Sequence, residues 1–77
     1  MYYVYVIKSI GKNYIYVGIS GDLKRRFSQH QNGHEKTTKP YRPFKLIITE
    51  TYNSRVEARK REKYLKSGCG KEFLKAL

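Results

Sequence analysis

Two runs of β-branched and aromatic residues near the N-terminus, 3–7 and 14–19, predict two strands. The short segment between them contains glycine and asparagine, which tolerate the backbone angles of a tight reversal, so we expect a β-hairpin. Side chains alternate between the faces of a strand, which places Tyr16 and Gly18 in one row. If the connection is a loop of about four or five residues, Tyr5 lies opposite Tyr16. Taken alone, such a tyrosine pair indicates packing.

The next segment predicts a helix from 23 to 32. Asp22 is a favourable N-cap because its carboxylate accepts a hydrogen bond from a free amide of the first turn, and Gly33 favours a stop. At 100° per residue, Leu23 and Phe27 define the buried stripe of this helix.

Four charged or titratable residues lie on this predicted helix. Arg26 and His30 are four residues apart, so they share a face and border the buried stripe. Lys24 and Arg25 point outward, where phosphate contact and a solvated face are equally compatible with the pattern.

The segment 34–43 is polar and basic, without apolar periodicity, and its two prolines restrict the backbone. It is interpreted either as a flexible surface loop or as an arm that contacts a phosphate backbone. The residues suited to the second role are Lys36, Thr37, Thr38, Lys39 and Arg42.

A third strand is predicted over 44–52. Its run of Leu46, Ile47 and Ile48 is nearly continuous, which is typical of a strand covered on both faces. We therefore expect this strand to be central or nearly central, with helices on either side.

A second helix is predicted over 55–67, beginning at the capping residue Ser54. Its helical spacing places Glu62 between Ala58 and Leu65 on the core-facing stripe. A carboxylate there is costly unless it meets a cation, a hydrogen-bond donor or a metal. The simplest alternative is an ion pair within the helix, with Arg59 or Arg61.

The last residues, 71–77, predict a short helix whose Phe73, Leu74 and Leu77 pack on the edge of the sheet. Together the elements predict an α/β (α+β) fold: a three-stranded antiparallel sheet flanked by helices, in the order β-β-α-β-α with a further short helix.

The composition limits the classes of function that the chain can have. The chain has 77 residues, which suits one domain over 1–77, and its formal net charge of +11 favours a polyanionic partner, nucleic acid before an acidic membrane surface. Nonspecific adhesion is the alternative. The single cysteine, Cys69, excludes an internal disulfide and a cysteine-based zinc site, and a free thiol suits the reducing cytoplasm. No apolar run is long enough to cross a bilayer.

Five features occur in a characteristic order: Tyr-Val-Tyr at 3–5, Tyr-Val-Gly at 16–18, Arg26, His30 and a helical Glu62. Over essentially the whole chain this set resembles the GIY-YIG nuclease superfamily. It is most similar to small stand-alone bacterial members related to the N-terminal nuclease domain of the excision-repair UvrC protein and to Slx1-type structure-specific endonucleases. The first motif lacks the family's leading glycine, and Val17 stands in the middle of the second.

The resemblance implies a divalent-metal-dependent DNA endonuclease. Glu62 would hold Mg²⁺ or Mn²⁺, since such ions commonly take one or two carboxylates and complete their coordination with water and phosphate oxygens. Arg26 would contact the nonbridging phosphate oxygens, and Tyr16 would orient the attacking water or the phosphate. Tyr5 is the family's favoured general base, while His30 would relay the proton or bind the phosphate, so the choice of base stays open.

The resemblance also implies a DNA partner and a place in DNA repair or recombination. Gly18 would leave room for DNA, and the basic residues described above would contact its backbone. Larger relatives obtain their specificity from attached domains, so branched and single-stranded DNA stay open as substrates, as does a protein partner that supplies specificity. The rival interpretations are a noncatalytic nucleic-acid-binding module and a protein-interaction domain; a membrane partner is not expected.

Overall fold

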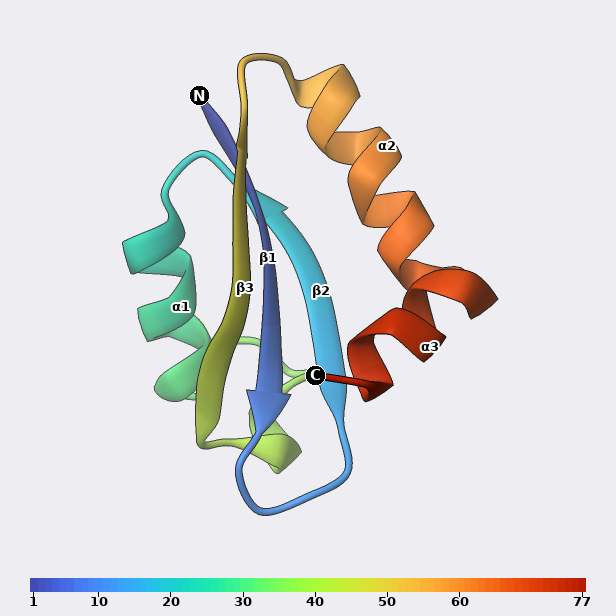
Figure 1. Cartoon of the computed structure of the whole chain (residues 1–77). Coiled ribbons are helices and arrows are strands. Elements are labelled where there is room, and N and C mark those ends of the chain that lie inside the picture. Colours follow the sequence, from blue (N-terminus) through green and yellow to red (C-terminus); the bar gives the residue numbers. More distant parts are fainter.

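The computed structural model describes all 77 residues and confirms the predicted α+β architecture. A three-stranded antiparallel sheet has the order β2-β1-β3, with α1 on one face and α2 and α3 on the other (Figure 1). The elements are β1 (Tyr2–Ser9), β2 (Ile15–Ser20), α1 (Leu23–Gln31), the 3-10 helix η1 (Lys39–Tyr41), β3 (Phe44–Tyr52), α2 (Arg55–Lys66) and α3 (Gly68–Lys75).

The hairpin has a different register from the expected one. Tyr5 pairs with Gly18 and Ile7 pairs with Tyr16, so the expectation that Tyr5 lies opposite Tyr16 is wrong. The connection, residues 10–14, has the expected length, and its last residue, Tyr14, stacks on Tyr41 with ring centroids 3.8 Å apart. The two tyrosines of the motifs therefore lie diagonally on the same face, an arrangement that places a glycine directly opposite Tyr5.

The central strand is β1, and β3 is an edge strand, so the predicted central position of 44–52 is wrong. Val6 pairs with Ile48 while Ile7 pairs with Leu46, which leaves Ile47 as the extra residue of a β-bulge. Because of this bulge, Ile47 and Ile48 both pack against the same core cluster, whereas Leu46 is 40% exposed. The uninterrupted apolar run reflects a bulge and not burial on both faces.

Each face of the sheet has its own apolar cluster, as the alternation in β1 and β2 predicts. The larger cluster lies under α2 and α3 and contains Val4, Val6, Val17, Ala58, Leu65 and Leu74. The smaller one lies on the α1 face, where Leu23 and Phe27 pack against Tyr5, Ile7 and Phe44. The polar side chains of the candidate active site lie between this second cluster and the loop that follows α1.

The helix ends follow the predicted signals. Asp22 accepts a hydrogen bond from the amide of Arg25 at 3.1 Å, and Ser54 accepts one from the amide of Glu57 at 3.3 Å. Between α2 and α3, the hydroxyl of Ser67 accepts a bond from the amide of Gly70 at 3.3 Å.

The last helix starts earlier than predicted, and only one of its three large apolar residues is buried. Leu74 shares the inward stripe with Gly70, which packs against the backbone of α2 so closely that a Cβ there would overlap with it. Phe73 and Leu77 are 44% and 59% exposed, so the expectation that they pack on the sheet edge is wrong. Phe73 lies on a different side of α3 from Leu74, and Leu77 lies beyond the end of the helix.

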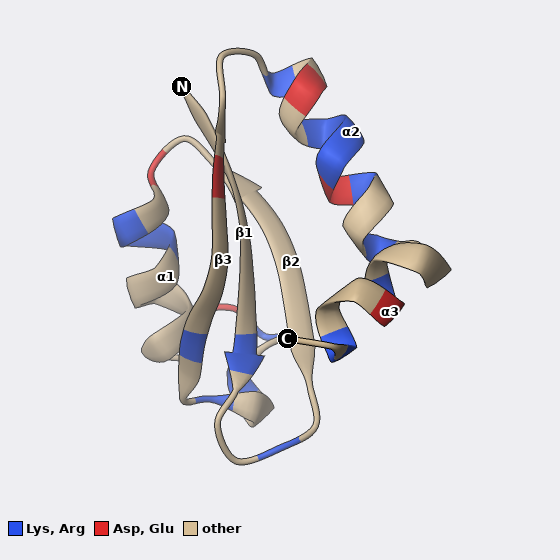
Figure 2. Ribbon diagram, in the orientation of Figure 1, with Lys and Arg blue, Asp and Glu red and all other residues tan.

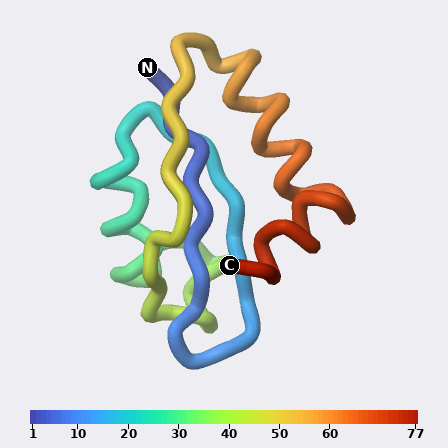
Figure 3. The backbone as a smooth tube through the Cα atoms, in the orientation of Figure 1, coloured from blue at the N-terminus to red at the C-terminus, as the bar shows by residue number.

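Positive charge covers both helical layers and the end of the hairpin (Figure 2). The segment after α1 folds back against that end: the amide of Ile10 donates to the carbonyl of Pro43 at 3.0 Å, and Nζ of Lys12 donates to the carbonyl of Pro40 at 2.9 Å (Figure 3). None of the helices has the length and apolar character needed to cross a membrane.

Candidate active site

Three buried polar side chains form a hydrogen-bonded row on the α1 face of the sheet. The hydroxyl of Tyr5 lies 3.0 Å from Nε2 of His30, and Nδ1 of His30 lies 2.8 Å from Oγ1 of Thr38. The Thr38 hydroxyl donates to the carbonyl of Glu35 at 3.5 Å, so its oxygen accepts from Nδ1–H. Nε2 is then the acceptor for the Tyr5 hydroxyl. The row points a phenolic proton at an imidazole nitrogen that can receive it.

The pKa values of the two partners fit this assignment. Burial raises the pKa of Tyr5 to about 12, and the neighbouring Arg26, which favours the phenolate, offsets only part of the effect. Burial and the positive charge of Arg26 lower the pKa of His30 from its ordinary value. At neutral pH the phenol is therefore protonated and the imidazole is neutral.

Tyr16 extends the aromatic surface of the row towards the free edge of β2. Its ring centroid lies 5.0 Å from that of His30 and 6.3 Å from that of Tyr5. Tyr16 is half-buried, so part of its side chain stays accessible next to two buried titratable groups.

Gly18 lies directly beneath the Tyr5 phenol. It is buried, and a Cβ there would overlap with the phenolic oxygen and ring. The structure thus gives this glycine a different reason from the expected room for DNA: its missing side chain makes room for Tyr5.

Replacing Gly18 by alanine should destabilise the fold by about 1–3 kcal/mol, because the added methyl group must displace a buried ring. Chemical denaturation of the two proteins measures the difference. Gly21→Ala is the matched control, since a Cβ at Gly21 meets no atom within 4 Å. Equal unfolding free energies for Gly18→Ala and the wild type would show that Tyr5 does not depend on this space.

Arg26 lies beside the row and is engaged by a carboxylate. One guanidinium nitrogen donates to Glu35 at 2.9 Å and another donates to Gln29 at 3.1 Å. The Arg26 side chain is 32% exposed, so its fork is open to solvent on one side. An anion such as a phosphate can replace the Glu35 carboxylate at this fork, because both present paired oxygens to a guanidinium.

Glu62 lies on the opposite side of the sheet, where α2 packs. As its spacing predicts, it sits between Ala58 and Leu65 and is only 8% exposed. Its oxygens lie 3.4 Å from Nζ of Lys66 and 3.8 Å from Nε of Arg59. The predicted alternative, an ion pair between Glu62 and Arg59, is thus present as a long contact.

The donor set at Glu62 is compatible with a hard divalent cation of the magnesium type. The chain contains no group of three or more His, Cys, Asp or Glu side chains that could hold a metal, so a chelating cage is absent. A single carboxylate is sufficient for Mg²⁺ when water and substrate oxygens complete the octahedron. Arg59 and Lys66 are both more than half exposed, which leaves them free to move from the carboxylate.

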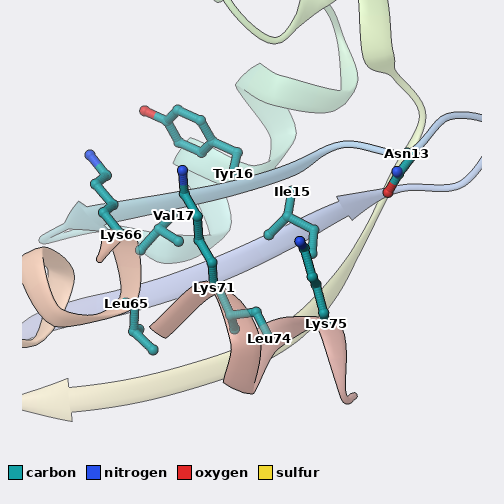
Figure 4. A pocket seen from close by; sticks show the side chains of 9 residues that line it. All are labelled: Asn13, Ile15, Tyr16, Val17, Leu65, Lys66, Lys71, Leu74 and Lys75. Carbon is teal, nitrogen blue, oxygen red and sulfur yellow. The ribbon is translucent and has the colours of Figure 1, made fainter. Parts of the chain in front are cut away.

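One residue next to each group of candidate site residues lies at the free edge of β2. Tyr16 comes from the face with the hydrogen-bonded row, and Lys66 contacts Glu62 on the other face. Both line one cavity at this edge (Figure 4). The structure thus gathers Tyr5, Tyr16, Arg26 and His30 in one cluster, while Glu62 lies on the other face, next to a lysine that lines the same cavity as Tyr16.

The residues of α1 and of 34–43 that were predicted to contact a phosphate backbone fall into two classes. One member, Thr38, is fully buried as the partner of His30, so the expectation that it contacts DNA is wrong. The exposed members are Lys24, Arg25, Lys36, Thr37, Lys39 and Arg42.

Sequence reasoning missed Glu35 and gave Thr38 a different role. They lie in a segment without periodicity, and their partners are eight and nine residues away in the chain. A local pattern does not signal such contacts, because they form only when the segment folds back on α1.

The lowered pKa of His30 predicts that the protein loses stability in mild acid. Below the unfolded-state pKa of about 6.5, the unfolded chain binds a proton at this residue that the folded chain does not. The free energy of unfolding should therefore decrease as pH falls from 7 towards 5, by up to about 1.4 kcal/mol per pH unit until the folded-state pKa is reached.

Denaturation at several pH values measures this slope, and His30→Gln should flatten it. His34→Gln changes an exposed histidine and should retain the wild-type slope. If the slope is unchanged in His30→Gln, the pH dependence of the unfolding free energy does not come from His30.

Comparisons with known proteins agree on one family. The model of the GIY-YIG catalytic domain matches residues 1–72. A UPF0213 protein of Staphylococcus epidermidis is 35% identical over 77 residues, which is 99% of this chain and 93% of the relative. A UPF0213 protein of Clostridium perfringens is 36% identical over 67 residues, covering 86% of this chain and 71% of the relative. No solved structure gives a significant match.

Proposed function

The chain belongs to the GIY-YIG family, and we propose that it is a divalent-metal-dependent DNA endonuclease that hydrolyses phosphodiester bonds in DNA repair or recombination. Domains of this family are typically nucleases, and GIY-YIG nucleases generally use divalent metal ions. The observation that carries the proposal is the row from Tyr5 through His30 to Thr38 beside the partly exposed Arg26. It combines a proton acceptor and an anion-binding group at one place.

Arg26 binds the scissile phosphate in this proposal. The phosphate replaces Glu35 at the guanidinium fork, and the permanent charge of Arg26 stabilises the negative charge that builds up on the nonbridging oxygens. Because the phosphate takes the place of the Glu35 carboxylate, the Arg26 guanidinium is paired with an anion before and after the exchange.

Tyr5 and His30 move the proton of the attacking water. A phenol with a pKa of about 12 is ionised in roughly one molecule in 10⁵ at pH 7, so Tyr5 alone is a poor base. As Tyr5 takes the proton of the water, its own proton passes across the 3.0 Å contact to Nε2 of His30. Thr38 holds the ring in the orientation that this transfer needs. Tyr16, next to the ring of His30, orients the water or the phosphate.

Glu62 would hold the divalent cation, Mg²⁺ or Mn²⁺. When bound, that cation supplies Lewis-acid stabilisation of the phosphate and of the leaving oxygen. Because Glu62 comes from the α2 side of the sheet, the DNA strand would cross the free edge of β2 between the two halves of the site. The exposed basic residues of α1 and of 34–43 would hold the rest of the DNA backbone.

The experiment that tests the proposal is cleavage of labelled linear, single-stranded, flapped and four-way DNAs with Mg²⁺, with Mn²⁺ and with EDTA. Products that appear only with a divalent ion are the expected result. Band shifts without products in every lane would contradict it and favour a noncatalytic nucleic-acid-binding module.

A further inference from the structure

The cavity at the free edge of β2 has an apolar floor and a basic rim. Its volume is about 340 Å³, and β2, the end of α2 and α3 enclose it (Figure 4). The floor consists of Ile15, Val17, Leu65 and Leu74. The side chains of Lys66, Lys71 and Lys75 rise around this floor, with Tyr16 on the same side (Figure 4). No acidic side chain lines the cavity, so its electrostatic character is cationic.

The fold sets the spacing of the lysines. Lys71 and Lys75 are one helical turn apart, so they lie on the same face of α3, and Lys66 comes from the last turn of α2. Each ammonium group is a compact charge on a flexible stem, which suits a phosphate. Lys66 also lies 3.4 Å from Glu62, so a phosphate bound here would lie next to the proposed metal ligand.

We propose that this cavity binds one unpaired nucleotide of the DNA strand, with the base on the apolar floor and the adjacent phosphates at the lysines. The inference rests on the proposed DNA substrate and specifies its form: a strand with an unpaired nucleotide beside the bond to be cut.

The floor distinguishes an unpaired nucleotide from a duplex. A duplex presents phosphates and groove edges while its bases stay stacked inside, so it would pair with the lysines and leave the apolar floor uncovered. An unpaired base can cover that floor, and the contact removes apolar surface of both base and floor from water. The volume lies at the small end of the range of ligand sites, about 300–1,000 Å³, which suits one nucleotide.

The test measures binding of hairpin DNAs with a short single-stranded extension, in EDTA so that cleavage does not occur. The extension carries either normal bases or abasic sugars, so the number of phosphates is constant. We expect the normal extension to bind about five- to tenfold more tightly, since the base buries apolar surface against the floor and an abasic sugar does not. Equal binding of the two DNAs would overturn the inference.

A pair of charge variants tests the lysines. Lys71→Gln with Lys75→Gln should weaken binding of the normal extension about tenfold at low salt and reduce the salt slope by about two. Lys60→Gln with Lys63→Gln makes the same change of charge on another basic surface of α2 and is the matched control. Equal losses in both variants would mean that only overall charge matters, and would overturn the inference. Absence of cleavage in other experiments would remove the nuclease proposal and leave these binding results unaffected.

Discussion

Glu62→Gln should reduce metal-dependent DNA cleavage by about a thousandfold while DNA binding is retained or slightly strengthened. The amide keeps the shape of the side chain but removes the charge that attracts a divalent cation. Lewis-acid stabilisation by such a cation is worth several kcal/mol, and about 1.4 kcal/mol corresponds to each factor of ten in rate. Affinity should not fall, because the protein becomes more positive and Glu62 itself repels phosphate. Cleavage rates and binding isotherms of the two proteins provide the measurements.

The control for this prediction lies on the same helix. Glu57→Gln makes the same change of charge at an exposed position near the start of α2. Cleavage by Glu57→Gln should equal that of the wild type. If Glu62→Gln also cleaves at the wild-type rate, the carboxylate serves only its ion pairs with Arg59 and Lys66, and the metal must be held elsewhere or be absent from the reaction.

The position of Glu62 could be predicted from the sequence because it depends on a local period. A helix with 3.6 residues per turn places Ala58, Glu62 and Leu65 on one stripe, and a capping serine marks where that helix begins. The same reasoning gave the bounds of α1 and the division of β1 and β2 into two faces. In each of these elements the information lies within a few neighbouring residues.

Features that depend on pairing between distant segments could not be predicted from a local pattern. The run from Leu46 to Ile48 has the appearance of a doubly covered strand, but its bulge is defined only against Val6 and Ile7 of β1. The burial of Thr38 likewise depends on a loop folding back on His30. A local pattern reports periodicity and composition, whereas register and loop closure are properties of two segments together.

Because the candidate site residues lie on two faces of the sheet, locating them requires both the local periodicity of each element and the pairing between distant segments. Tyr5 and His30 belong to one apolar cluster, and Glu62 borders the other. Because β2 is an edge strand, a substrate strand that passes around it could contact both faces. The motif order in the sequence identifies the residues, but the strand order decides where they can act together.

Tyr5→Phe should lower the cleavage rate about 10²- to 10⁴-fold, the range typical of a lost general acid–base group. The substitution removes only the hydroxyl, so the ring continues to fill the space above Gly18. It also leaves Nε2 of the buried His30 without its partner, which should cost about 1–3 kcal/mol of stability. Denaturation must therefore accompany the kinetics, at a temperature where both proteins are fully folded.

The matched control is Tyr3→Phe, on the same strand and the same face of the sheet but outside the hydrogen-bonded row. It should cleave DNA at the wild-type rate. For the wild type, activity should be lost only at a pH below the ordinary histidine pKa of about 6.5, because the pKa of His30 is lowered and its protonation blocks the nitrogen that receives the phenolic proton. A folded Tyr5→Phe protein with wild-type turnover would exclude Tyr5 from proton transfer and leave His30 as the base that acts directly on the water.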